Sequence, residues 1–69
     1  MPKYYTEDTD GNRLIIERNH HFAAAEAHTL WFLAQDKSVG EVINVQESGF
    51  NARSDITSKF FHKSYFLGE

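Results

Sequence analysis

The sequence contains no cysteine, and this absence removes two ways of stabilising a small domain. Neither a disulfide nor a thiolate zinc site can form, which argues against a small secreted scaffold. Proline occurs once and glycine four times, and no low-complexity segment or interdomain linker is evident. The stability of this 69-residue chain must therefore come from apolar packing or from association with another molecule.

Long apolar runs and a strong charge of one sign are also missing. The longest apolar run, residues 30–34, is far shorter than the roughly 20 residues that span a bilayer. Residues 1–6 contain no apolar signal segment, so we expect a cytoplasmic protein without membrane contact. The seven basic residues are scattered and the net charge is −3, which argues against a nucleic-acid groove and is too weak for a phosphate-backbone mimic.

The sequence is nevertheless rich enough in apolar residues to fold. Hydrophobic residues make up 41% of the chain, and it contains one Trp, three Tyr and six Phe. This content is too apolar for intrinsic disorder, and the length allows one domain, residues 1–69. A single small folded domain is therefore expected.

Two short β-prone segments, residues 3–7 and 13–17, flank the sequence DTDGN at residues 8–12. Gly and Asn tolerate the positive φ that tight hairpin connections require, so the segments predict a β-hairpin. Alternation in the second strand puts Leu14 and Ile16 on one face, which we expect to be the core side, and Ile15 on the other.

Residues 20–36 predict one long amphipathic helix, because they contain five alanines and no Gly, Pro or Val, and Asn19 can cap the first turn. At about 100° per residue one apolar stripe is predicted to face the core. It comprises Ala23, Ala27, Leu30 and Ala34, flanked by Trp31 and Leu33. The opposite, outer side would carry His21, Ala25, His28, Phe32 and Gln35. Phe32 would then need a cover, either the C-terminal segment or a partner.

Residues 41–47 predict a third strand, in which Ile43 and Val45 share a face. The segment 50–69 has no clean periodicity and is open to three interpretations: a second helix capped by Ser54, an edge strand, or an arm. The predicted fold is therefore α+β, with a ββαβ core over residues 1–49, in which a hairpin and a third strand form a small antiparallel sheet against the helix. An aromatic C-terminal segment, as a short helix or strand, completes it.

The order hairpin, alanine-rich helix and Val/Ile strand, over residues 3–47, resembles the ββαβ plan of small phage-encoded proteins. It is similar to the layout of phage RNA-polymerase inhibitors and of some small anti-CRISPR proteins. This resemblance implies a protein that acts in a host cytoplasm by covering a working surface of a host protein. It transfers no functional residue, because the families share no motif with this chain, and a fold plan does not imply a function.

Three groups of residues could carry chemistry, and each is incomplete. Residues 8–12 place oxygens as a calcium loop does, but the sixth and twelfth loop positions are Arg13 and Asn19 instead of Gly and Glu. The histidines His20, His21 and His28 lack a metal-ligand spacing. Ser58, His62 and Asp55 lie near one another in sequence without a glycine elbow. We therefore expect no catalytic, cofactor or metal site and no enzyme activity.

The surplus of aromatic residues indicates a protein-binding module. Its predicted contact residues are His21, His28 and Phe32 on the outer helix face and Phe61, Tyr65 and Phe66 near the C-terminus. The same C-terminal aromatics could belong to the core. Two alternatives remain: a self-associating subunit whose C-terminal segment docks on a neighbour, and a small metal-binding protein.

Overall fold

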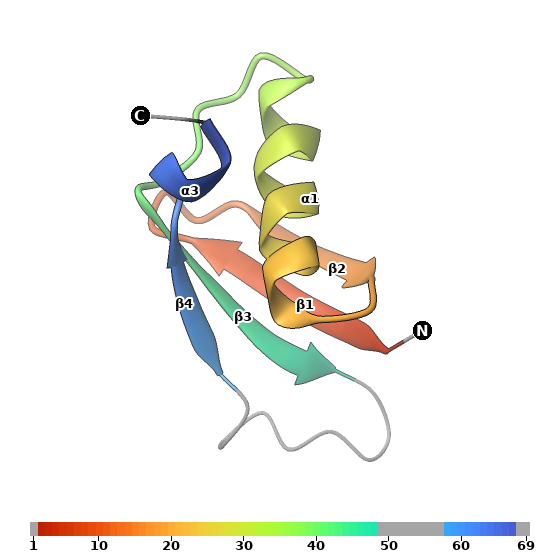
Figure 1. Cartoon of the computed structure of the whole chain (residues 1–69). Helices are drawn as coiled ribbons and strands as arrows, with labels where there is room; N and C mark the ends of the chain where they lie inside the picture. Colours follow the sequence, from red (N-terminus) through yellow and green to blue (C-terminus); the bar gives the residue numbers. More distant parts are fainter. Residues whose placement is uncertain (1, 49–57, 68–69) are drawn as a thin grey trace.

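The computed structural model describes residues 2–48 and 58–67. Within these ranges the elements follow in the order β1 (Lys3–Asp8), β2 (Arg13–Glu17), α1 (His21–Leu33), β3 (Val42–Ser48), β4 (Lys59–His62) and α3 (Ser64–Leu67). The strands form one antiparallel sheet in the order β2-β1-β3-β4, and α1 lies across one face of it (Figure 1). The predicted α+β fold, with its hairpin, helix and third strand, is confirmed.

The hairpin has the turn and the facing that its sequence predicts. Gly11 has φ +87°, and its N–H donates a hydrogen bond to the carbonyl of Asp8 at 3.0 Å. The turn therefore uses the left-handed conformation that glycine tolerates best. In β2, Ile16 is buried and Leu14 packs against the core, while Ile15 is 61% exposed on the other face of the sheet. The core side of β2 is therefore the predicted one.

Helix α1 is shorter than predicted at both ends. It begins at His21, and the N-cap is His20, whose Nδ1 accepts a hydrogen bond from Ala23 N at 3.2 Å, so the prediction of Asn19 as cap is wrong. At the other end, Asp36 N donates to Leu33 O and Lys37 N donates to Phe32 O, each at a distance of 3.1 Å. Asp36 adopts φ 60°, which is the left-handed conformation that ends a helix in a Schellman motif.

The predicted orientation of α1 is wrong. The buried residues of α1 are Ala24, Ala25, His28, Thr29 and Phe32, whereas Leu30 and Trp31 are 51% and 55% exposed. The helix is apolar on both sides, so periodicity cannot select a face. Two alanines let the helix approach the sheet closely, and the hydrogen-bonding partners of His28 lie on that side. The outward placement of His28 and Phe32 is corrected accordingly.

Strand β3 lies in the middle of the sheet between β1 and β4. Ile43 and Val45 are fully buried beneath α1, which confirms that these two residues share a face of the strand. The segment after it contributes an edge strand, β4, and a single helical turn, α3. A helix start at Ser54, considered from the sequence, falls outside the described residues.

Candidate functional site

A buried polar cluster joins α1 to the hairpin. Thr6 and Asp8 are two residues apart on β1 and face α1, where His28 lies between them. His28 Nδ1 is 2.7 Å from Thr6 Oγ1, and His28 Nε2 is 2.8 Å from Asp8 Oδ2. Thr6 and His28 have no exposed surface, and Asp8 is 4% exposed. Each ring nitrogen thus has a partner inside the protein, as a buried imidazole requires.

The Asp8 carboxylate is saturated with donors. Its Oδ1 accepts from the backbone N–H of Asp10 at 2.8 Å and of Asn12 at 3.2 Å, and its Oδ2 accepts from Asn12 Nδ2 at 2.9 Å. Burial by itself would raise the pKa of Asp8. The hydrogen bonds from His28, Asn12 and Asp10 outweigh it and lower the pKa below its ordinary value. Asp8 is therefore ionised, and His28 Nε2 donates to it.

The direction of the hydrogen bond between Thr6 Oγ1 and His28 Nδ1 depends on whether Nδ1 carries a proton. The Thr6 hydroxyl has a single proton and two acceptors within reach, His28 Nδ1 and the carbonyl of Leu14 at 3.1 Å. If His28 is neutral, its Nδ1 accepts a hydrogen bond from the Thr6 hydroxyl. If His28 is protonated, Nδ1 donates to Thr6 and the hydroxyl proton goes to Leu14 O. In both arrangements each ring nitrogen of His28 has a hydrogen-bonding partner.

Hydroxyl, imidazole and carboxylate also form the relay of a nucleophilic catalyst, but this cluster lacks access to a substrate. A catalytic hydroxyl must reach a bound substrate, whereas Thr6 is fully buried beneath α1. The cluster has the properties of a structural connection, because it satisfies polar groups that the fold buries and fixes the helix to one position over β1.

A second set of contacts holds the loop after α1 against the hairpin turn. Asn12 Nδ2 donates to Ser38 O at 2.8 Å, and Ser38 Oγ donates to Asp10 Oδ2 at 3.1 Å. Gly40 lies so close to the turn that an added Cβ would come within 2.6 Å of Asp10 N and would overlap Thr9 Oγ1. Residues 8–12, considered from sequence as a calcium loop, therefore use their oxygens to bind the chain itself.

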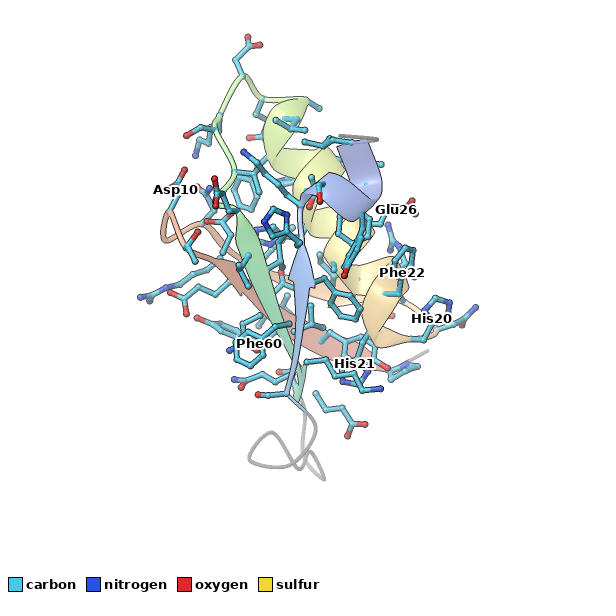
Figure 2. All side chains as sticks on the ribbon, turned by 60° about the vertical axis from the view of Figure 1, so that its left-hand side comes forward. Asp10, His20, His21, Phe22, Glu26 and Phe60 are labelled. Atoms are coloured by element: carbon cyan, nitrogen blue, oxygen red, sulfur yellow. The ribbon has the colours of Figure 1, made fainter. Side chains whose placement is uncertain are left out.

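The three helix histidines occupy separate environments. His20 caps α1, the ring of His21 lies 4.6 Å from that of Tyr4, and His28 is buried. Figure 2 shows His20, His21 and Phe22 together at the start of α1. Among residues 2–48 and 58–67, no three or more His, Asp or Glu side chains are grouped as a metal site requires. The residues that the sequence suggested as a catalytic group have other partners. Ser58 Oγ donates to Gln46 Oε1, and His62 Nδ1 contacts Ser64 Oγ. Asp55 lies outside the described residues.

The C-terminal aromatics cover the first turn of α1. The ring of Phe22 lies 5.8 Å from that of Phe61 and 5.0 Å from that of Phe66. Phe61 and Phe66 are half-buried and pack against the core, whereas Tyr65 is 67% exposed. Phe61 and Phe66 are only partly exposed to solvent, and their role in binding a partner stays a prediction. Tyr65 has the exposure that such a role needs.

The most extensive exposed apolar feature of α1 is a stripe on its outer side. We call Leu30, Trp31 and Leu33, with the half-buried Ala23 and Ala27, the outer helix stripe. The three large side chains are 51%, 55% and 38% exposed. The sequence pattern singles out these residues as an apolar stripe and assigns that stripe to the core side of the helix.

Sequence reasoning missed Thr6, and it considered Asp8 only as a calcium-loop oxygen and not as a partner of His28. A signal for them was present, because Tyr4, Thr6 and Asp8 alternate along one strand and must share a face.

Comparison with protein families, with curated proteins and with solved structures finds no match for this chain. Along the described residues, no helix is long and apolar enough to cross a bilayer.

Proposed function

We propose that this chain is a non-catalytic protein-binding module that acts by covering a surface of another protein. The observation that carries the proposal is the outer helix stripe, where Leu30, Trp31 and Leu33 are left exposed on a helix whose other side forms the core. Exposed Trp and Leu in a group favour a protein contact, since Trp is the residue most enriched among binding hot spots.

The stripe has the form of a helix that enters a groove. Ala23, Ala27 and Leu30 follow one another at intervals of four and three residues, so they align along the axis of α1. The alanines allow close approach, and Leu30 and Trp31 supply large apolar anchors beside them. The partner surface is therefore an apolar groove on a folded protein.

The finer form of the proposal follows from the resemblance to small phage-encoded proteins. There the partner is a host protein, and binding inhibits or modulates it by occlusion. A buried Thr6–His28–Asp8 cluster supports the non-catalytic part, because the hydroxyl most like a nucleophile is sealed from substrates.

The proposal is tested with the variants Trp31→Ala and Leu30→Glu and a control, Phe60→Lys, which changes a residue that is 66% exposed on the sheet face opposite α1. All three must unfold at the same urea concentration as wild type. A protein captured by wild type and the control is then purified, and its affinity is measured by calorimetry. Loss of a hot-spot side chain is expected to raise the Kd by about 30-fold or more.

Two results contradict the proposal. One is a captured protein whose Kd is the same for Trp31→Ala and wild type, which would place binding elsewhere. The other is cooperative unfolding of Trp31→Ala at a clearly lower urea concentration, which would make the stripe part of the folded core.

A further inference from the structure

The outer edge of β2 has a property that is independent of the outer helix stripe. Strand β2 is at the end of the sheet, and among the described strands only β1 pairs with it. Asp8 N donates to Asn12 O and Arg18 N donates to Pro2 O, so the even-numbered residues of this hairpin bond to β1. By the alternation of an antiparallel ladder, the N–H and C=O groups of Arg13, Ile15 and Glu17 point outward.

The sequence of β2, RLIIE, is complementary to itself when it runs antiparallel. If two copies pair about a two-fold axis at Ile15, each Arg13 lies opposite Glu17 of the other copy, and Ile15 lies opposite itself. Arg13, Ile15 and Glu17 are also the residues whose backbone groups point outward. The charge pairing and the hydrogen-bonding register therefore coincide.

The complementarity extends beyond β2 on the sheet face opposite α1. In the observed register Glu7 lies beside Arg13, with Glu7 Oε2 and Arg13 Nε 3.0 Å apart, and Lys3 lies beside Glu17. Pairing two copies would continue this row as Glu7, Arg13, then Glu17 and Lys3 of the second copy. The signs alternate at every step, and like charges never lie directly opposite.

We propose that β2 is a homodimer interface, through which two copies of this chain join the four described strands of each into one continuous antiparallel sheet. The occupant of the edge is a second copy because an edge defended against pairing carries proline, a bulge or unmatched charges, and β2 has a matched pair instead. Strand β4, the other edge, has no such match: its only charged or titratable residues are Lys59 and His62, and it contains no carboxylate.

The Ile15 side chain is less exposed to solvent in the proposed dimer than in the single chain. Ile15 is 61% exposed in the single chain and would contact Ile15 of the second copy, flanked by Tyr5 from each β1. Glu17 O already accepts from Arg18 Nη1 at 2.6 Å, so this carbonyl exchanges or shares that donor on pairing. The carbonyls of Arg13 and Ile15 gain a backbone donor.

Charge exchange tests the interface with the full chain. Mass is measured by sedimentation over a concentration series up to about 1 mM, the weak end of measurable affinity. Glu17→Arg puts like charges opposite one another at two symmetry-related positions, as does Arg13→Glu, and each is expected to weaken dimerisation at least about tenfold. A 1:1 mixture of the two variants restores both opposite-charge pairs and is expected to form a heterodimer. Glu26→Arg, on the exposed face of α1, is the matched control and keeps the wild-type mass profile.

Amide exchange gives a second measurement that does not depend on a variant. With rising concentration, exchange slows at the N–H groups of Arg13, Ile15 and Glu17, while those of Leu14 and Ile16 are protected throughout by β1. A chain that is monomeric at every concentration overturns the proposal. So does a dimer that Glu17→Arg leaves unchanged, or a variant mixture that stays monomeric. None of these results bears on binding through Leu30 and Trp31.

Discussion

His28 connects a helix to a strand through both of its ring nitrogens, at 2.7 Å from Thr6 Oγ1 and 2.8 Å from Asp8 Oδ2. A buried polar group is tolerated only when it is hydrogen-bonded, so these three residues depend on one another. Removing the imidazole would leave an ionised carboxylate and a hydroxyl without their partner in a sealed space.

We therefore expect His28→Ala to destabilise the domain by about 3 kcal/mol, because the buried carboxylate and hydroxyl lose a hydrogen-bonding partner and the missing ring leaves a cavity. Urea unfolding followed by circular dichroism measures the change. The control is His62→Ala, which removes an exposed histidine and is expected to cost less than about 0.5 kcal/mol. Equal stability of the two variants would show that the cluster contributes nothing.

Asp8 makes the stability of the fold dependent on acid. Because folding lowers the pKa of Asp8, the unfolded chain holds this proton more tightly than the folded one. The stabilisation is complete above the ordinary aspartate value of 3.8 and is lost as pH falls from there through the lowered pKa of the folded state. NMR titration of the Asp8 carboxyl carbon is expected to give a midpoint below 3.8. Urea midpoints are expected to fall more steeply with acid in wild type than in Asp8→Asn, and parallel curves would contradict this assignment.

At the scale of elements, the hairpin turn and the loop after α1 are held together by close backbone approach. Gly40 carries no side chain because Thr9 and Asp10 occupy that space, while Gly11 has open space and a positive φ. The two glycines therefore serve different physical needs, one steric and one conformational.

Substituting each glycine by alanine separates the two needs. Gly40→Ala forces the loop away from the turn and is expected to cost about 2–3 kcal/mol as an overpacked contact. Gly11→Ala meets no atom and is expected to cost about 1 kcal/mol from the left-handed conformation alone. The measurement is the free energy of unfolding in urea, and a reversed order of the two costs would refute the steric account of Gly40.

At the scale of the whole molecule, a chain of 69 residues has a small core, and association would add to its stability. A dimer through β2 makes the melting temperature rise with protein concentration, because only folded chains pair. We expect this rise in wild type and in Glu26→Arg, and a much smaller one in Glu17→Arg. Calorimetric scans at several concentrations measure it, and a concentration-independent melting temperature in wild type would contradict the dimer.

Local sequence alone determined the hairpin, the presence of α1 and the facing of β2 and β3. Gly11 sets the turn, a run without Gly or Pro sets the helix, and strict alternation puts Ile16, Ile43 and Val45 inside. Only the tertiary structure decided which face of α1 is buried, because the helix is apolar on both sides and its hydropathy pattern has two solutions. His28 faces the sheet because Thr6 and Asp8 lie there to bond it, and Trp31 is consequently left outside. Partners distant in sequence settle that choice, and no local pattern contains them.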